Sequence, residues 1–308
     1  MIFLERKVVF ATKSMYNYPI KIRFICKEKI MNCNEFDGYI KIDNVTDLDL
    51  QQTLDCGQSF RWTENTDGSF DGVAFGKKVR VWLDENNLYI ENSNKEDFEN
   101  IWKSYFDLEL DYGKIRESIS KIHPILSEAT QYAPGIRILQ QEPYEALCTF
   151  IISQNNNIKR IKGIVQRLCE CFGEEISQGV YAFPTPQKMA NLTVEELAPI
   201  RAGFRNRYLI DAAQKVCSGE VSLESCRTLE YEKARAELMK ITGVGIKVAD
   251  CTLLFGLHRV EAFPVDVWMK RAMEKLFPSL KVSDFGEYAG IAQQYIFHYS
   301  RMHPELFS

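Results

Sequence analysis

The chain has 308 residues, of which 45% are hydrophobic and 26% are charged, an ordinary composition for a globular protein that can bury a full core in two or three lobes. No apolar stretch approaches the roughly 20 residues that a transmembrane helix needs, which excludes an integral membrane protein. The formal net charge of −4 argues mildly against a nucleic-acid partner, because domains that bind nucleic acids are usually basic.

Nine cysteines are spread over the chain, at positions 26, 33, 56, 148, 169, 171, 217, 226 and 251. They form no Cys-x-x-Cys pair and no series with metal-ligand spacing, and an odd number of cysteines in apolar stretches indicates reduced thiols. We therefore expect a protein that is not secreted, and that lies in the cytoplasm or, in a eukaryote, in the nucleus.

Residues 1–30 differ from the rest of the chain in charge. They hold seven Lys and Arg against two Glu, a net charge of +5, which leaves −9 for the remainder. The segment lacks a long apolar core followed by a small-residue cleavage site, so a secretory signal is not expected. We interpret it as a basic extension without a catalytic role. A Lys-rich organelle transit peptide and a translation start at Met31 are the alternatives.

Residues 31–115 are predicted to form a small β-rich domain with an antiparallel sheet, because residues 39–93 have the composition of strands and turns. Residues 79–83 and 88–91 are short strands on either side of the turn sequence Asp84-Glu85-Asn86-Asn87. Residues 66–69, with the sequence Thr-Asp-Gly-Ser, mark a second hairpin.

Beyond about Lys95, apolar residues recur at three- and four-residue spacing, which indicates helices. The clearest case is residues 158–172, where Ile158, Ile161 and Phe172 share one face and Gly173 is the expected stop. Similar patterns cover residues 207–217, 231–241, 248–256, 267–276 and 288–299. We therefore expect residues 116–308 to form a two-lobed, all-helical body, and the whole fold to be α+β.

The most informative stretch is Leu238-Met-Lys-Ile-Thr-Gly-Val-Gly-Ile-Lys-Val-Ala-Asp250. One amphipathic helix ends near Ile241, Gly243-Val244-Gly245 makes a tight turn, and a second helix begins near Lys247. Glycines allow positive φ and a close approach to another surface, and the free N–H groups at the new helix start suit a phosphate. Such a hairpin holds the DNA backbone without selecting a base. An ordinary helical corner with a Gly cap is the alternative interpretation.

Two residues near this hairpin could carry chemistry. Lys247 lies at a helix N-terminus, where the positive end of the helix and partial desolvation favour the neutral amine, a nucleophile that can form a Schiff base. Asp266 follows 19 residues later in Phe-Pro-Val-Asp-Val, at the start of a helix that it could cap. Taken alone, Lys247 could equally be a solvated surface lysine, and Asp266 only an N-cap.

The hairpin, the Lys-x-Ala-Asp sequence after it and the Pro-x-Asp sequence beyond resemble the helix-hairpin-helix (HhH-GPD) superfamily of DNA glycosylases over roughly residues 40–300. Residues 57–62 (Gly-Gln-Ser-Phe-Arg-Trp), 153–160 (Ser-Gln-Asn-Asn-Asn-Ile-Lys-Arg) and 202–207 (Ala-Gly-Phe-Arg-Asn-Arg) are similar to its 8-oxoguanine DNA glycosylase branch. The resemblance implies that Lys247 is the nucleophile and Asp266 the essential carboxylate. It also implies that Gly243, Val244 and Gly245 contact DNA phosphates.

The resemblance further implies which residues bind the damaged base. It assigns to the Gly57 carbonyl the hydrogen bond from N7–H of 8-oxoguanine, a donor that guanine lacks. It places the flipped base between Cys251 and the Phe297 ring, with Gln293 on the Watson–Crick edge. Cys251 lies four residues after Lys247, and Phe297 four after Gln293, so that each pair shares a helix face. Simple core packing of Cys251 and Phe297 is the alternative.

Asn155, Arg160 and Arg205 match positions at which the family contacts the cytosine opposite the lesion, and guanidinium groups suit the acceptors on a base edge. Phe204 matches the wedge residue, which fills the gap in the base stack and is more often Tyr in the family. Trp268 stands where a His is familiar, so one neighbouring phosphate or base contact is not carried over. Some relatives hold an iron–sulfur cluster on four cysteines after the hairpin helices, which cannot form here because Cys251 is the last cysteine.

The sequence thus predicts a bifunctional DNA glycosylase/AP lyase that excises 8-oxoguanine from duplex DNA by base flipping, a Schiff base on Lys247 and β-elimination. We expect a monomer that acts on double-stranded DNA and not at a membrane, with no cofactor and no metal centre, although carbonyls of the hairpin could bind a cation. One alternative is a monofunctional alkylbase DNA glycosylase, against which Lys247 argues. The other is a non-catalytic helix-hairpin-helix DNA-binding protein, which needs neither Lys247 nor Asp266.

Overall fold

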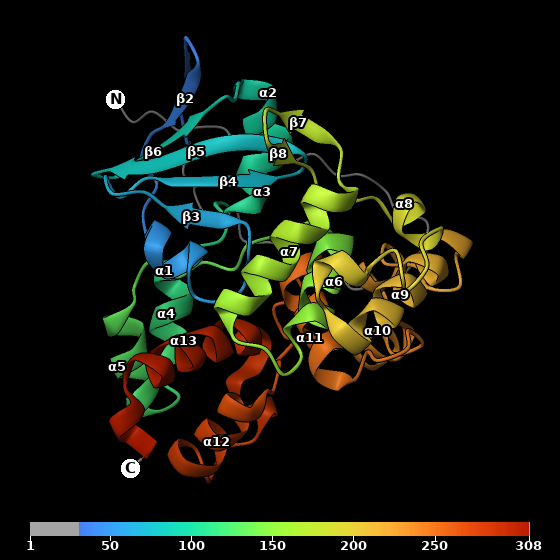
Figure 1. Cartoon of the computed structure of the whole chain (residues 1–308). Coiled ribbons are helices and arrows are strands. Elements are labelled where there is room, and N and C mark those ends of the chain that lie inside the picture. Colours follow the sequence, from blue (N-terminus) through green and yellow to red (C-terminus); the bar gives the residue numbers. More distant parts are fainter. Residues whose placement is uncertain (1–30, 308) are drawn as a thin grey trace, which may run out of the picture. The chain divides into compact units, whose positions relative to one another are not determined.

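The computed structural model describes residues 31–307 (Figure 1). The basic extension predicted at residues 1–30 lies outside the described residues. Within residues 31–307, no helix is long and apolar enough to cross a membrane.

The N-terminal part is a six-stranded antiparallel sheet, as the strand and turn pattern predicts. Its spatial order is β1-β2-β6-β5-β4-β3. The predicted strands at residues 79–83 and 88–91 lie within β5 and β6, with Val81 opposite Ile90, and the predicted hairpin at residues 66–69 joins β3 to β4. The strands are β1 (Cys33–Phe36), β2 (Tyr39–Ile42), β3 (Trp62–Glu64), β4 (Phe70–Ala74), β5 (Lys77–Asp84) and β6 (Asn87–Glu91).

One face of the sheet is covered by short helices and has a core of its own. Alternate residues of the central strands, such as Val81 and Ile90, are fully buried there, as expected for a sheet with one solvated face. The Trp62 indole N–H donates to the Tyr105 hydroxyl at 2.7 Å inside this core. The helices are α1 (Leu50–Leu54), α2 (Lys95–Asp97), a π-helical turn at Phe98–Trp102, and α3 (Lys103–Tyr105).

A helical body follows the sheet and contains the second core. The helix predicted at residues 158–172 is confirmed as α7, with Asn157 as its N-cap and Gly173 as its C-cap. The other predicted helices correspond to α9–α13. The helices are α4 (Tyr112–Ser120), α5 (Pro124–Tyr132), α6 (Pro143–Ser153), α7 (Ile158–Phe172), α8 (Pro186–Ala190), α9 (Asn206–Ser218), α10 (Tyr231–Leu238), α11 (Ile246–Leu257), α12 (Val267–Leu276) and α13 (Ala289–Met302).

Two details of the helical prediction are wrong. The body is not entirely helical, because β7 (Glu175–Ser177) and β8 (Val180–Tyr181) form a small hairpin after α7. These strands are too short for an alternating pattern to stand out, and Gly179 at φ +69° makes the turn between them. The helix predicted to end at residue 241 ends at Leu238, because the chain turns before it reaches the glycines.

The boundary predicted between residues 115 and 116 stays a prediction. Helix α4 spans it, and its residues Tyr112, Ile115 and Ile119 are buried in the core of the helical body. The core of the sheet, by contrast, is built mainly from residues 40–108, with Leu139 added from the connection to α6.

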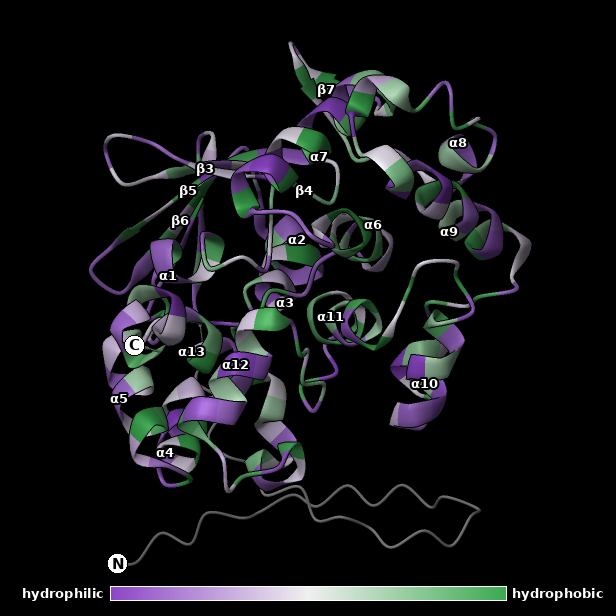
Figure 2. Ribbon diagram, turned by 60° about the horizontal axis from the view of Figure 1, so that its bottom comes forward, coloured by the Kyte–Doolittle hydropathy of each residue, from purple (hydrophilic) through white to green (hydrophobic). Residues whose placement is uncertain are grey.

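Helices α6 and α11 are packed closely together at the centre of the body, and both are hydrophobic over most of their length (green in Figure 2). A side chain at Gly256 would place its Cβ 2.9 Å from the Ala146 Cβ and 3.1 Å from the Pro143 Cα, so that glycine permits this approach. The rings of Phe150 and Phe255 stack at 5.2 Å across the contact. Helix α11, which starts at the hairpin, is therefore held firmly from Val248 to Leu257.

Candidate active site

A cavity opens where α11, α13 and the loop after α1 meet, and it brings together residues that lie far apart in the sequence. Its volume is about 340 Å³ when the open mouth is included. Six of the predicted site residues line it, two proposed for chemistry and four for base binding. The lining residues are Gly57, Phe150, Lys247, Cys251, Phe255, Pro264, Asp266, Gln293, Gln294 and Phe297.

Lys247 occupies the second position of α11, directly after the N-cap Gly245 and Ile246. Its side chain is half-buried, and its Nζ donates to the Ser153 hydroxyl at 2.9 Å. Nζ also lies 5.2 Å from the centre of the Phe150 ring, within the range of a cation–π contact. Both partners come from α6, so the α6–α11 packing fixes the amine at the wall of the cavity.

Asp266 is the N-cap of α12, and its Oδ1 accepts a hydrogen bond from the Met269 N–H at 2.8 Å. The cap expected from the sequence is therefore confirmed. Asp266 also lines the cavity together with Pro264 and Lys247. A carboxylate that caps a helix is held in one orientation, so the structural role and a catalytic role are compatible.

Cys251 of α11 and Phe297 of α13 both line the cavity. Burial raises the pKa of the Cys251 thiol to about 11, and the nearby charge of Lys247 only partly opposes this. Cys251 is thus a neutral thiol at physiological pH, a polarisable surface against which an aromatic base can pack.

Gly57 and Gln293 supply polar groups at this cavity. Gly57 has φ +90°, and a Cβ there would lie 3.3 Å from Ile158 Cδ1 and 3.5 Å from Phe297 Cε1. Glycine therefore allows the backbone to approach the Phe297 ring. The Gln293 side chain is 5% exposed, and its Oε1 is buried without a hydrogen-bond partner among the described residues. A buried amide oxygen left unpaired is costly unless a ligand supplies the missing donor.

The hairpin turn has the geometry expected of a phosphate-binding turn. Gly243 has φ +82°, Val244 is buried, and Gly245 is exposed. No side chain caps the first N–H groups of α11, so these donors are available to an anion. The turn is held from behind by Asp211, whose Oδ2 accepts from the Thr242 N–H at 2.7 Å.

The four residues proposed for the opposite base and the wedge do not line the cavity. Asn155, in the loop between α6 and α7, and Arg160, in the first turn of α7, are exposed, and Phe204 is 51% exposed in a short 3₁₀ turn before α9. Arg205 is buried instead, and donates to the carbonyls of Gln154 and Ala202. Its guanidinium lies 4.3 Å from the centre of the Phe204 ring.

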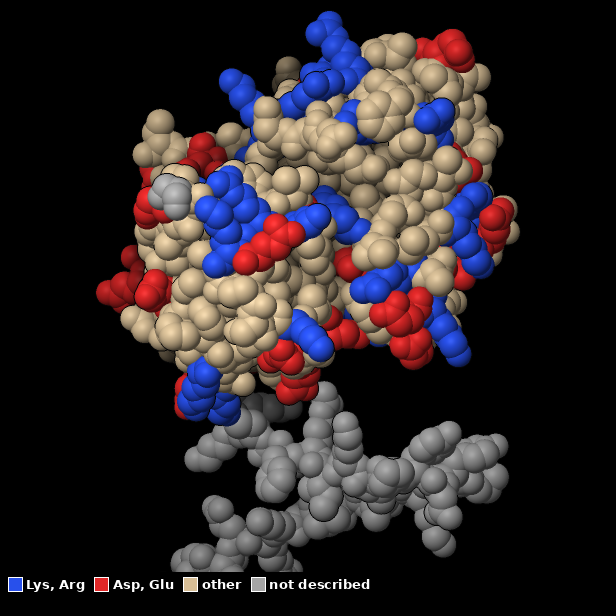
Figure 3. All heavy atoms as spheres, turned by 90° about the horizontal axis from the view of Figure 1, so that it is seen from below, with Lys and Arg blue, Asp and Glu red and all other residues tan. Residues whose placement is uncertain are grey.

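Two of these residues, Arg160 and Arg205, place their positive charges near each other. Burial and the neighbouring charge of Arg160 both lower the pKa of Arg205, and Arg205 Nε is buried without a partner among the described residues. On the face shown in Figure 3, Lys and Arg side chains lie at several places beside Asp and Glu side chains. Two guanidinium groups close together favour an anionic or acceptor-rich partner.

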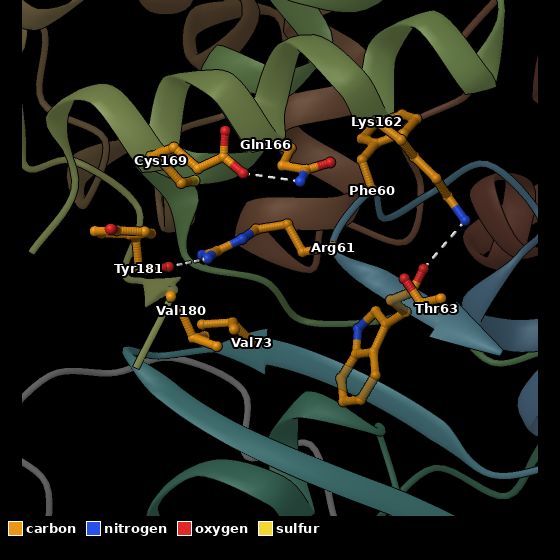
Figure 4. Close-up of a pocket in the computed structure, with 12 residues that line it drawn as sticks. Phe60, Arg61, Thr63, Val73, Lys162, Gln166, Cys169, Val180 and Tyr181 are labelled. Atoms are coloured by element: carbon orange, nitrogen blue, oxygen red, sulfur yellow. Dashed lines mark hydrogen bonds between the residues drawn. The ribbon is translucent and has the colours of Figure 1, made fainter. Parts of the chain in front are cut away.

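A second cavity, between the sheet and α7, shows how the segment after Gly57 is fixed (Figure 4). Arg61 reaches across it and donates to the Tyr181 carbonyl and, at 3.4 Å, to the Glu145 carboxylate. Burial raises the pKa of Glu145 to about 7, although Arg61 acts in the opposite direction. Lys162 of α7 donates to Asp55 and to the Trp62 carbonyl at 2.9 and 3.1 Å. These contacts tie residues 55–62 to the helical body.

The structure adds site residues that the sequence pattern did not single out. They are Ser153, which accepts from Lys247, and the cavity-lining residues Phe150, Phe255, Pro264 and Gln294. Phe150 and Phe255 lie in continuous apolar helices and are indistinguishable from core by periodicity. Ser153 does begin one of the stretches that resemble the family, and this was the available signal.

The match to known proteins agrees with this architecture. Residues 41–147 match the model of the 8-oxoguanine DNA glycosylase N-terminal domain, and residues 148–284 match that of the HhH-GPD superfamily of base excision DNA repair proteins. An N-glycosylase/DNA lyase of Saccharomyces cerevisiae is 33% identical over 260 residues, which are 75% of this chain and 69% of the relative. The N-glycosylase/DNA lyase OGG1 of Arabidopsis thaliana is 30% identical, over 82% of this chain and 77% of its own.

Solved structures of 8-oxoguanine glycosylases are also similar to this chain. The Clostridium acetobutylicum 8-oxoguanine glycosylase/lyase, in complex with double-stranded DNA containing cytosine opposite to 8-oxoG, superposes with a TM-score of 0.83 and 38% identity, covering 89% of this chain and 98% of its own. MBOgg1, in complex with a low-affinity DNA ligand, superposes with a TM-score of 0.85 and 42% sequence identity. The match covers 89% of this chain and 99% of MBOgg1. The fold and the hairpin thus define an HhH-GPD base excision repair enzyme. The chain belongs to the 8-oxoguanine DNA glycosylase family.

The two hairpin glycines should respond differently to the same substitution. Gly243→Ala places a residue with a side chain in the left-handed region, which costs about 1–2 kcal/mol, and its Cβ would come closer than 3 Å to the Tyr208 ring. We expect the free energy of unfolding to fall by about 2 kcal/mol or more.

Gly245→Ala is the matched control, because φ there is −99° and nothing lies within 4 Å of the added Cβ. Its stability should change by less than about 1 kcal/mol, while binding to undamaged duplex DNA weakens since the methyl group stands where a phosphate would approach. Urea denaturation and fluorescence anisotropy measure the two effects. Equal losses of stability would contradict this account of the turn.

Proposed function

We propose that this protein is a bifunctional DNA glycosylase/AP lyase that excises 8-oxoguanine from duplex DNA, with Lys247 as nucleophile and Asp266 as its carboxylate. The observation that carries the proposal is the single cavity lined by Lys247 and Asp266 together with Gly57, Gln293 and Phe297. The proposed nucleophile, the carboxylate and the residues proposed to bind the base thus line one cavity, and Lys247 lies in the first turn of the helix that follows the hairpin. An enzyme that acts on a base inside a duplex must first flip it out of the stack, at a cost of a few kcal/mol.

The cavity suits a flipped purine with a hydrogen on N7. Cys251 and the Phe297 ring, which both line the cavity, would face the two sides of a planar base, and the unpaired Gln293 Oε1 would accept from its Watson–Crick edge. The Gly57 carbonyl would accept from N7–H of 8-oxoguanine, whereas guanine would turn a lone pair toward it. Leaving a buried polar group unpaired discriminates more strongly than a small difference in size does.

The chemistry follows from the position of Lys247. The neutral amine attacks C1′, the bond from C1′ to the base breaks, and the base leaves with the bonding electron pair. Opening of the sugar ring gives a Schiff base between Lys247 Nζ and C1′. Loss of a proton from C2′ then expels the 3′ phosphate by β-elimination and nicks the strand. Asp266 stabilises the positive charge that develops on the sugar, and Ser153 orients the amine.

Asn155, Arg160 and Arg205 would contact the cytosine left opposite the lesion, with Phe204 filling the gap. Arg205 must give up one or both of its carbonyl partners for this, while the exposed Arg160 needs no such change. As an enzyme acting on genomic DNA, the protein would work in the nucleoid or the nucleus.

The first test is Lys247→Gln, which removes the nucleophile and keeps a side chain of similar length. We expect base release to stop and borohydride trapping to an 8-oxoguanine:cytosine duplex to disappear, while binding to that duplex stays within about threefold. Trapping by the wild-type protein on the same duplex is the positive control. Undiminished base release by Lys247→Gln would favour a monofunctional, water-using glycosylase.

Asp266→Asn separates the carboxylate from the cap, because Asn is about as good an N-cap as Asp. The melting temperature should hardly change, whereas kcat should fall by roughly 100-fold or more, the usual loss when a charge that stabilises a transition state is removed. A matched Asp266→Ala variant loses both the cap and the charge. Normal activity per folded molecule of Asp266→Asn would leave Asp266 only the structural role.

Arg160→Ala tests the contact with the opposite base. Each good guanidinium contact to a base edge discriminates by about 1–3 kcal/mol, so the wild type should prefer cytosine over adenine opposite the lesion by about tenfold or more. The variant should lose most of that preference and less of its rate opposite cytosine. Single-turnover rates on the two duplexes measure both. Equal wild-type rates would show that Arg160 binds phosphate or packs elsewhere.

A further inference from the structure

Helix α9 connects the phosphate-binding hairpin to the wedge residue through one of its faces. Tyr208, Asp211 and Lys215 follow one another at three- and four-residue spacing and therefore share that face. Asp211 accepts from the Thr242 N–H at 2.7 Å, and Lys215 Nζ donates to the Lys240 carbonyl at 2.6 Å. Lys215 and Asp211 also form an ion pair at 3.3 Å. These contacts hold residues 240–242 against α9.

Tyr208 extends this contact to the turn itself. Its ring lies so close to Gly243 that a Cβ on Gly243 would come nearer than 3 Å to three of the ring atoms. Gly243, which provides the positive φ of the turn, thus also packs against the Tyr208 ring.

The same ring also supports Phe204. The Phe204 and Tyr208 rings meet edge to face, with their centres 5.7 Å apart, a favourable aromatic geometry. The Arg207 guanidinium lies 5.0 Å from the centre of the Tyr208 ring and donates to its hydroxyl at 3.2 Å. Phe204 is half exposed and follows Gly203, which has φ +65°.

The helix that carries Tyr208 is fixed in the body. Leu209, Ala212 and Ala213 on its other face are fully buried in the core, and close-packed interiors transmit displacement instead of absorbing it. The distance between the turn and the wedge is therefore set by the Tyr208 ring.

We propose that Tyr208 is a positioning residue that couples phosphate binding at the hairpin to insertion of Phe204 into the base stack. The proposal rests on the proposed function, in that the hairpin binds a phosphate and Phe204 fills the gap. A phosphate held at residues 243–246 then fixes which base step Phe204 meets. Without the ring, the hairpin still binds the backbone, but Phe204 loses its support and enters the stack slowly.

The test uses a duplex in which 2-aminopurine stands opposite a stable abasic-site analogue, so that its fluorescence rises when the wedge unstacks it and no chemistry by Lys247 is needed. We expect Tyr208→Leu to slow this rise at least tenfold in stopped flow, while the Kd for undamaged duplex changes less than threefold. Tyr208→Phe keeps the ring and should stay within threefold of wild type in both. Tyr132→Leu, the same change at a tyrosine on α5, is the control and should have no effect.

A double-mutant cycle with Phe204→Leu distinguishes coupling from general damage. If Tyr208 acts through Phe204, then Tyr208→Leu should cost less than threefold once Phe204 is replaced. Tyr208→Met, which fills the space without a flat ring, serves if Tyr208→Leu does not fold. Wild-type insertion rates in these ring-less variants, or fully additive effects in the cycle, would overturn the proposal.

The two proposals can fail separately. Release of 8-oxoguanine by the wild-type enzyme is measured on a separate duplex that contains 8-oxoguanine. If no base is released, 8-oxoguanine is rejected as the substrate, and the 2-aminopurine experiment still tests the role of Tyr208. Normal release together with a Tyr208→Leu variant that inserts Phe204 at the wild-type rate rejects the positioning role alone.

Discussion

The site depends on the close contact between α6 and α11. Gly256 lets the two helices approach so closely that a Cβ there would lie 2.9 Å from the Ala146 Cβ and 3.1 Å from the Pro143 Cα. The stacked Phe150 and Phe255 rings line the cavity. The same helix pair carries Lys247 on one member and its hydrogen-bond partner Ser153 on the other. A small shift between the helices would separate amine from hydroxyl, so the packing of this largely apolar interface controls the position of the Lys247 amine, the proposed nucleophile.

The loop between α1 and the sheet is fixed beside the site partly by the buried side chain of Gln58. Gln58, next to Gly57, donates to the carbonyls of Thr53 and Arg137 at 2.8 and 2.7 Å and accepts from the Leu139 N–H at 2.9 Å. Because all three of these partners are backbone groups, the Gln58 amide fixes the position of the backbone around it as well as its own side chain. Gly57 is held on one side by Gln58 and on the other by the Phe297 ring. An accepting carbonyl can discriminate between two purines only if it cannot turn away.

Much of this could be predicted from the sequence, and the failures have physical causes. Periodicity located α7 and α12 at their observed ends, since both have a capping residue and a continuous apolar face. It missed β7 and β8, which are shorter than any pattern it can detect. The family motifs named six residues that line one cavity, yet could not show that Arg205 is buried against backbone carbonyls. Such contacts join distant segments and leave no periodic trace.

The net charge of −4 was a poor guide to the partner, and the structure shows why. Much of the phosphate binding expected here falls to backbone N–H groups at the start of α11, which contribute nothing to the count of charged residues. Many lysines and arginines are paired within the protein, as Lys215 is with Asp211 and Arg235 with the buried Asp250. Total charge therefore counts neither backbone donors such as those at the start of α11 nor the cations already committed to the fold. Where a site uses helix termini and a few placed guanidinium groups, the distribution of donors decides the partner, and an acidic chain can belong to a family that repairs DNA.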